Sequence, residues 1–195
     1  MFIKILFIII LCFFQLCVIH CNSSQKNYSP KYLSANEYFP LKNNMSWEYI
    51  NEAPRGETII IDVICTGDGS KFHLDKFPFF GYTESKIEVF ADEAGNIYVK
   101  DISGISNLLL PSSDIFTDGY IWKYTDLLQA YLTKTSVKVV TEAGTYDCIY
   151  INFTDGFTFS YEMWLAKNTG IVKWGANRTN PPSIPLYYVL KEYKN

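Results

Sequence analysis

The sequence has little histidine and lacks the residue spacings of common metal and nucleotide sites. Only two histidines occur among the 195 residues, His20 and His73. A site built from several histidines is therefore excluded, and no Cys-x-x-Cys pair replaces it. A phosphate-binding loop, a dinucleotide fingerprint and the Gly-x-Ser-x-Gly turn of many hydrolases are also missing. We assign no catalytic residue, metal ligand or cofactor, and we expect a protein that is not an enzyme.

Basic residues are also in short supply. The chain has 17 lysines and arginines against 20 acidic residues, which gives a net charge of −3. A nucleic-acid-binding domain normally carries a basic patch, so nucleic acid is not expected as a partner. Hydrophobic residues make up 48% of the chain and aromatic residues 17%. This composition predicts a folded globular domain and excludes a disordered chain.

The start of the chain is its most apolar part. Lys4 precedes an apolar run from Ile5 to Phe14, and polar residues follow from Asn22 onward. A charged start, a short apolar core and a polar exit are typical of a secretory signal peptide. We therefore interpret residues 1–20 as a cleaved signal peptide. The alternative is a retained membrane anchor, which would need about 20 apolar residues.

Cys21 follows this segment directly, after a Val-Ile-His triplet that ends in His20. The arrangement resembles a bacterial lipoprotein box, although a small residue normally stands where this chain has His20. The resemblance implies a lipid on Cys21 that holds the protein in the bacterial cell envelope; a secreted or periplasmic protein without lipid is the alternative. The largely polar residues 21–36 would form a flexible tether, and residues 37–195 the folded domain.

Cys65 and Cys148 are the cysteines that remain beyond the signal peptide and the lipidation site. An even pair outside the cytoplasm predicts a disulfide, which would stabilise the fold by roughly 4 kcal/mol. The alternative is that each cysteine is buried separately as a small apolar residue. The sequence leaves both open.

From Tyr38 onward, β-branched and aromatic runs alternate with short turns that contain glycine, the pattern of consecutive β-hairpins. We expect strands over residues 45–51, 57–65, 71–80, 86–91, 96–102, 137–142, 145–153, 157–166, 171–174 and 186–193. Residues 124–132 fit a short helix or a strand. The tetrapeptide Phe-Thr-Asp-Gly at 116–119 and 153–156 predicts an Asp-Gly turn at each place.

Consecutive hairpins predict a mainly β fold: a single curved antiparallel sheet or an open half-barrel, with at most one or two short helices. Such a sheet has a concave face. Aromatic side chains bury large areas, so the aromatic residues either line this face or fill it as a core. We expect most of the rings to be core.

Several short motifs resemble a family of bacterial exported proteins and lipoproteins whose activity is uncharacterised. The motifs are Tyr38-Phe39-Pro40-Leu41-Lys42, Trp47-Glu48-Tyr49, Glu142-Ala143-Gly144-Thr145-Tyr146-Asp147-Cys148, Glu162-Met163-Trp164-Leu165-Ala166 and Gly170-Ile171-Val172-Lys173-Trp174. Asn44 stands where the family has a turn glycine, and Glu142 where it has proline. The resemblance implies a curved sheet distantly similar to the outer-membrane lipoprotein carrier, with a concave apolar face for an acyl chain. No binding residue carries over.

Three functional hypotheses follow from these patterns. The first is a non-enzymatic extracytoplasmic envelope lipoprotein whose curved sheet binds a hydrophobic ligand, such as a lipid or another lipoprotein, or a protein partner. The second is a surface-displayed structural or interaction protein with a fully packed core. The third, a carbohydrate-acting enzyme or lectin, would need two carboxylates across a groove. Glu84, Glu88 and Glu162 are the candidate acids, and nothing in the sequence singles them out.

Overall fold

The computed structural model describes residues 35–52, 60–67, 71–75, 87–100, 103–112, 117–178 and 186–194. They contain the short helix α2 (Ala35–Tyr38) and the strands of a single sheet. The strands are β1 (Ser46–Asn51), β2 (Ile60–Gly67), β3 (Lys71–Asp75), β4 (Ile87–Ala91), β5 (Ile97–Lys100), β6 (Ser106–Leu110), β7 (Tyr120–Lys123), β8 (Gln129–Thr141), β9 (Gly144–Thr154), β10 (Phe159–Ala166), β11 (Gly170–Arg178) and β12 (Leu186–Lys194).

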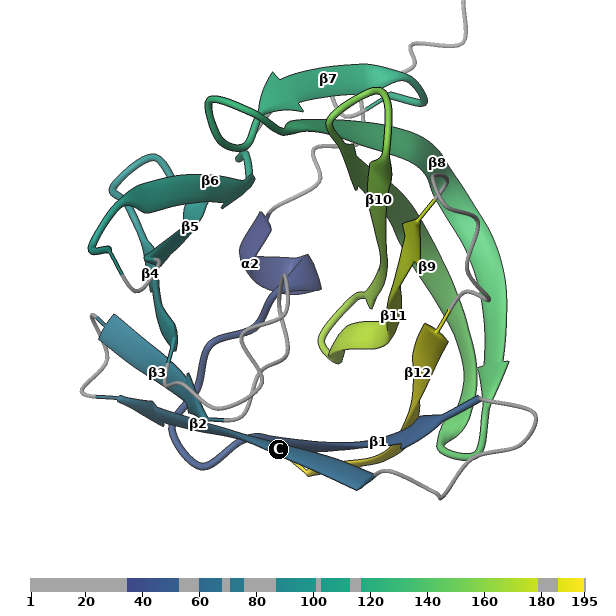
Figure 1. The fold of residues 1–195 in the computed structure, drawn as a ribbon. Coiled ribbons are helices and arrows are strands. Elements are labelled where there is room, and N and C mark those ends of the chain that lie inside the picture. The colour runs from purple at the N-terminus through teal and green to yellow at the C-terminus, as the bar shows by residue number, and fades with distance from the viewer. Residues whose placement is uncertain are drawn as a thin grey trace, which may run out of the picture. The chain divides into compact units, whose positions relative to one another are not determined.

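The sheet is antiparallel and curls round on itself (Figure 1). Its order is β6-β5-β4-β3-β2-β1-β12-β11-β10-β9-β8-β7, so all consecutive strands except β6 and β7 are neighbours in the sheet. The first strand, β1, pairs with the last, β12, and joins the two halves. The edges are β6 and β7, which are consecutive in the chain. The predicted mainly β fold, a single curved antiparallel sheet that does not close, is confirmed.

Alternation along the strands sends every second side chain to the concave side. In β4, Ile87 and Val89 are buried, while Glu88 and Phe90 are half-buried and Ala91 is exposed. In β10, Tyr161, Met163 and Leu165 are buried in the same rhythm. A period of two is expected where one face of an antiparallel sheet packs on a core and the other meets water.

Aromatic side chains fill the concave side in a continuous chain of ring contacts. Trp174 stacks on Tyr188 with 4.1 Å between ring centroids and on Tyr161 with 6.1 Å, and Tyr49 meets it edge-on at 6.2 Å. Phe153 extends the chain beyond Tyr161, at 6.5 Å. All five rings belong to one core cluster of buried residues, as the sequence predicts.

Two buried hydrogen bonds tie β1 to the β10–β11 hairpin across β12. The Trp47 indole N–H donates to the Thr169 carbonyl at 2.6 Å, and the Tyr49 hydroxyl donates to the Ile171 carbonyl at 2.8 Å. Gly170 lies against the Trp47 ring with a φ of 88°, and a Cβ atom here would come within 3.4 Å of the indole nitrogen. This left-handed φ and close approach explain the glycine of the turn motif.

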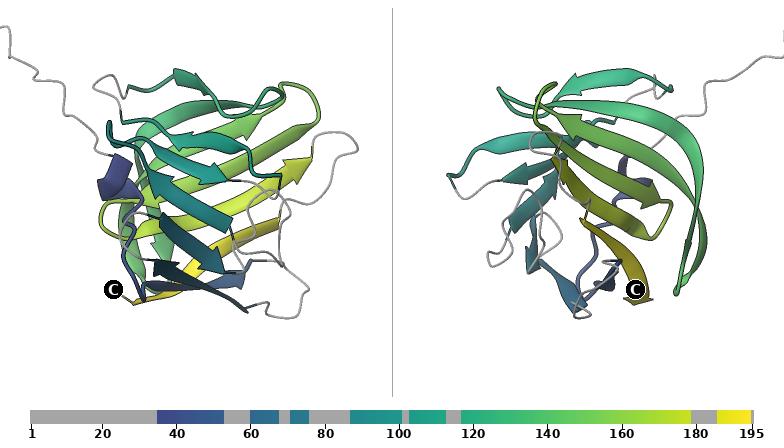
Figure 2. Two further views of the ribbon diagram at one scale, coloured as in Figure 1. Left: turned by 90° about the vertical axis from the view of Figure 1, so that its left-hand side faces the viewer. Right: turned by 45° about the vertical axis from the view of Figure 1, so that its right-hand side comes forward.

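The helix α2 lies at one end of the curled sheet, which Figure 2 (left) shows in side view. Ala35 and Tyr38 are buried. The Asn168 N–H in the β10–β11 turn donates to the Glu37 carbonyl at 2.6 Å, and Lys167 forms an ion pair with the Glu37 carboxylate. We call this end, where the β10–β11 turn and the last residues of β12 also lie, the α2 end.

The opposite end carries the β7–β8 and β9–β10 turns, because antiparallel strands reverse direction at each turn. Gln129 pairs with Thr154 across β8 and β9, so the two turns lie near each other. Strand β10, with eight residues, separates this end from the α2 end by roughly 27 Å at about 3.4 Å per residue. We call it the distal end.

A side-chain hydrogen bond bridges the two edges of the sheet. The Trp122 indole N–H on β7 donates to the Leu108 carbonyl on β6 at 3.1 Å. Pro111, directly after β6, has no N–H group with which to extend a strand ladder. Trp122 therefore holds together, through one bond, two edges that backbone pairing leaves separate in the described residues.

Some local expectations need correction. Residues 125–128 form a turn and β8 begins at Gln129, so the helix considered for 124–132 is wrong. Strands β6 and β7 were not predicted. Asn44 has a φ of 67°, a conformation that asparagine tolerates better than most residues. Ala35, which we had placed in the tether, is buried.

We expect the substitution Trp122→Phe to loosen the two edges of the sheet. It keeps an aromatic ring and removes the indole N–H that reaches the Leu108 carbonyl, a bond worth about 1 kcal/mol. Hydrogen exchange should speed up in β6 and β7 and stay unchanged in β10. A loss of stability with unaltered exchange in β6 would show that the bond does not hold the edges.

Candidate functional site

The concave side, where a hydrophobic ligand was expected, is occupied by the protein's own side chains. The exposed fraction is 0% for Ile151, Phe153 and Met163, and 1% for Tyr49. A side chain without accessible surface adjoins no space as large as a water molecule. The packing leaves no room for an acyl chain beside these residues.

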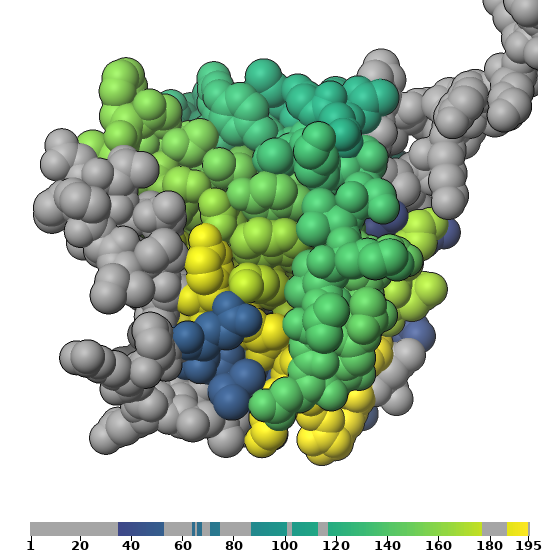
Figure 3. Space-filling model, turned by 90° about the vertical axis from the view of Figure 1, so that its right-hand side faces the viewer, coloured from purple at the N-terminus to yellow at the C-terminus, as the bar shows by residue number. Residues whose placement is uncertain are grey.

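The convex side carries an outer aromatic cluster of Tyr150, Glu162, Trp164, Lys173 and Tyr187, on neighbouring strands β9 to β12. Figure 3 shows this side of the sheet. The Tyr150 and Trp164 rings stack with 4.6 Å between centroids and 4° between planes, and Tyr187 meets Trp164 edge-on at 5.9 Å. The Lys173 ammonium lies over both Trp164, at 5.6 Å, and Tyr187, at 4.7 Å. The faces of the Trp164 ring are thus covered by protein groups.

The two tyrosine hydroxyls, the Glu162 carboxylate and the Lys173 ammonium of the outer aromatic cluster all have partners. The Tyr150 hydroxyl donates to one carboxylate oxygen of Glu162 at 3.0 Å, and the Tyr187 hydroxyl to the other at 2.6 Å. Burial, and then the Glu162 charge and hydrogen bonds, raise the pKa of both tyrosines well above the usual range. Lys173 forms an ion pair with Glu52 at 2.8 Å. The cluster therefore acts as a clasp across four strands rather than as an open platform for a sugar ring.

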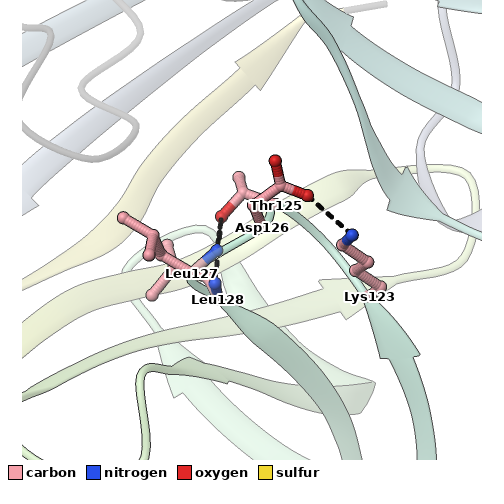
Figure 4. Close-up of polar contacts among 5 residues, drawn as sticks. All are labelled: Lys123, Thr125, Asp126, Leu127 and Leu128. Atoms are coloured by element: carbon pink, nitrogen blue, oxygen red, sulfur yellow. Dashed lines mark hydrogen bonds and ion pairs between the residues drawn. The ribbon is translucent and has the colours of Figure 1, made fainter.

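The β7–β8 turn at the distal end is held rigid by its own side chains (Figure 4). The Thr125 hydroxyl accepts the N–H groups of Leu127 at 3.1 Å and Leu128 at 2.9 Å. Lys123 and Asp126 form an ion pair at 2.6 Å. Such side-chain bonds to the backbone fix a turn locally. The turn presents Leu127 to solvent, with 83% of the residue exposed.

The neighbouring β9–β10 turn is built in a similar way. One Asp155 carboxylate oxygen accepts the N–H groups of Phe157, Thr158 and Phe159 at 2.9 to 3.0 Å, and the Thr158 hydroxyl donates to the other oxygen at 2.7 Å. Gly156 follows with a φ of 83°, as the Asp-Gly pattern predicts. The turn presents Phe157, which is 86% exposed.

A cavity of about 300 Å³ lies between the two turns, lined among others by Lys123, Asp126, Leu127, Tyr131, Asp155 and Gly156. Leu127 lines the cavity, and Phe157 follows directly on Gly156, which also lines it. Large apolar side chains on rigid, exposed turns are unusual for a monomer surface and mark an interaction site when they gather. We call these two turns and their cavity the distal rim, and it is the candidate functional site.

A larger cavity of about 510 Å³ lies at the α2 end, lined by Asn36, Glu37, Pro40, Leu41, Lys42, Phe72, Ala91 and Asn168. Its walls mix charged, amide and apolar groups. Glu37 is already engaged with Lys167 and Asn168 there. No second feature converges on this cavity, so it is the weaker candidate.

The two cysteines proposed to pair lie far apart in the sheet. Cys148, on β9, is a buried free thiol, and burial raises its pKa to about 12. Cys65 lies on β2, and β1, β12, β11 and β10 separate the two strands. The buried free thiol of Cys148 fits the alternative in which each cysteine is a small buried residue. The side chain of Cys65 lies outside the described residues.

The other residues considered in the sequence are scattered. His73 is a partly exposed residue of β3, and Glu88 opposite it on β4 pairs with Lys71 at 3.4 Å. Glu162 belongs to the outer aromatic cluster. Glu84 and the lipidation candidate Cys21 lie outside the described residues.

The described part of the chain contains no group of three or more histidine, cysteine or acidic side chains placed to hold a metal ion. None of its helices is long and apolar enough to span a bilayer.

Sequence reasoning missed both the outer aromatic cluster and the distal rim. The cluster depends on register: Trp164 lies opposite Tyr150 and Lys173, which only the strand pairing reveals. The distal rim had a partial signal in the Asp-Gly turn at 155–156, next to Phe157. An exposed phenylalanine beside a predicted turn could have been noted as an unusual surface residue.

Comparison with known proteins supports the fold. No model of a known protein family matches the chain, and no curated protein matches it either. Among solved structures, the chain is similar to a candidate exported protein with a YmcC-like fold from Bacteroides fragilis. That match has 14% identity and a TM-score of 0.51, and covers 81% of this chain and 99% of the other. A candidate lipoprotein from Parabacteroides distasonis matches with 12% identity and a TM-score of 0.49, over 80% and 98% of the chains.

We expect Glu162→Gln to lower the pKa of Tyr150 and Tyr187, because the carboxylate charge opposes formation of the tyrosinates. The absorbance of the protein at alkaline pH measures these two pKa values. Because the pKa of both tyrosines is raised in the folded state, they contribute stability below about pH 10. This contribution is lost as the pH rises through the pKa values of the folded state. Unfolding at neutral pH should cost about 1.5 kcal/mol less in the variant. Glu192→Gln, at an exposed glutamate paired with Lys194, is the control. Unaltered tyrosine titration would contradict the clasp.

Proposed function

We propose that this chain is an exported, non-enzymatic binding protein, held in the cell envelope by a lipid on Cys21, which recognises a protein partner with its distal rim. The observation that carries the proposal is the exposure of Leu127 and Phe157, at 83% and 86%, on two rigid neighbouring turns. We therefore prefer the second hypothesis, a packed core with an interacting surface, to the hypothesis of a lipid bound inside the sheet.

Two features support export and anchoring. The sequence begins with the pattern of a signal peptide and places Cys21 directly after it. The protein from Bacteroides fragilis that shares the fold is itself described as exported. A diacyl chain on Cys21 would supply the two membrane signals that stable anchoring needs.

The packed concave side supports a binding surface on the outside. Ile151, Phe153 and Met163 have no accessible surface, and the outer aromatic cluster has its rings, tyrosine hydroxyls and carboxylate already paired. Among the features described, the distal rim combines exposed apolar groups, rigidity and a cavity. Partner proteins commonly anchor on a few large side chains held in place in this way.

The anchor is tested by labelling producing cells with palmitate, in the wild type and in Cys21→Ser. We expect label in the wild type and its loss in the variant, because the thiol at residue 21 would be the only acceptor. Label that survives the substitution would refute lipidation at Cys21.

The packed core is tested by native mass spectrometry of the protein and by titration with an apolar fluorescent dye. We expect no co-purifying lipid beyond the covalent anchor and no saturable dye binding, because the inward side chains leave no space. Two results would contradict the packed core and favour a hydrophobic ligand inside the sheet. They are a tightly bound fatty acid or phospholipid, and dye binding that is abolished by Met163→Trp.

A further inference from the structure

The cavity of the distal rim has an excess of negative charge. Its charged lining residues are Lys123, Asp126 and Asp155. Lys123 is paired with Asp126 at 2.6 Å, which leaves the charge of Asp155 unbalanced by any lysine of the lining. The rim therefore presents a carboxylate charge between two exposed apolar tips.

This charge is fixed by the turn itself. The N–H groups of Phe157, Thr158 and Phe159 and the Thr158 hydroxyl point at the Asp155 carboxylate, and these bonds hold its pKa well below the usual range. These bonds therefore favour the ionised form of the carboxylate in the folded protein. Because the same bonds shape the turn, they also fix the position of the carboxylate relative to the backbone of Phe157.

The charge of the distal rim argues against a lipid surface as its occupant. Loops that enter a membrane combine apolar tips with basic residues that attract anionic lipids. Here the tips are flanked by Asp126 and Asp155.

We propose that the distal rim docks a polypeptide that presents a basic side chain next to an apolar one. The ammonium or guanidinium group enters the cavity beside Asp126 and Asp155, and the apolar neighbour packs between Leu127 and Phe157. This inference rests on the proposed function and names the chemistry of its partner. Charge complementarity sets the choice of partner, and the two apolar tips supply contact area that needs little reordering on binding.

The experiment uses the full mature lipoprotein in phosphatidylcholine nanodiscs. It is titrated with acetyl-Gly-Arg-Leu-Gly-amide and, as the matched probe, with acetyl-Gly-Glu-Leu-Gly-amide, and the amide signals of the two turns are followed by nuclear magnetic resonance. We expect saturable shifts at Leu127, Gly156 and Thr158 with the arginine peptide at millimolar concentration. The glutamate peptide should bind at least about tenfold more weakly.

Three substitutions at exposed positions test the contacts without disturbing the core. Leu127→Ala and Phe157→Ala should each weaken the binding of the arginine peptide at least about threefold. Asp126→Asn should reduce the preference for the arginine peptide over the glutamate peptide. Val140→Ala is the control, since Val140 is also a large exposed apolar residue, at 74%, but lies near the α2 end of β8. It should leave binding unchanged.

Equal shifts with both peptides, no saturable shift with arginine, or equal affinities in all variants would overturn the proposal. A second test is flotation of the Cys21→Ser chain with vesicles of phosphatidylcholine and phosphatidylglycerol. Flotation that is lost in Phe157→Ala would overturn the proposal and identify a membrane as the occupant. None of these outcomes alters the palmitate or dye results. A failure of the basic-partner proposal is thus distinguishable from a failure of the anchored, core-packed protein.

Discussion

The pairing of β1 with β12 is the contact on which the rest of the structure depends. β1 lies between β2 and β12, so it joins the strands of the first half of the chain to those of the second half. Its inward residues Trp47 and Tyr49 reinforce the junction, because each donates a buried hydrogen bond beyond β12 to the β10–β11 hairpin. Without this junction the chain would form two separate meanders, each with an exposed apolar face.

The junction also decides which surfaces remain for function. Once the sheet curls, the inward rings of Tyr49, Phe153, Tyr161, Trp174 and Tyr188 meet and occupy the concave side. The convex side between β9 and β12 is locked by the outer aromatic cluster. Leu127 and Phe157 remain exposed at the turns of the distal end. The distal rim is therefore the surface at which we propose that a partner binds.

Much of the fold could be read from the sequence because its signals are local. Most of the predicted strands, such as 45–51 and 86–91, show alternation of apolar and polar residues next to turn residues. Strand β6 was missed because its Ser-Asn start reads as a loop. The sites were harder for a physical reason. Trp164 meets Tyr150 and Lys173 only through the register of three strands, and Leu127 meets the Asp155 turn only because β8 pairs with β9.

The attachment of α2 has a mechanical consequence for a protein held by its N-terminus. A pull along the chain before Ala35 reaches α2 first, where Glu37 is bound by Lys167 and by the Asn168 backbone. Force would therefore pass into the tip of the β10–β11 hairpin, in the second half of the chain, before it could peel β1 from its neighbours. The Trp47 bond to Thr169 adds a second link at the same hairpin. The load would then be shared across the junction of the sheet, and the strands would not separate one by one.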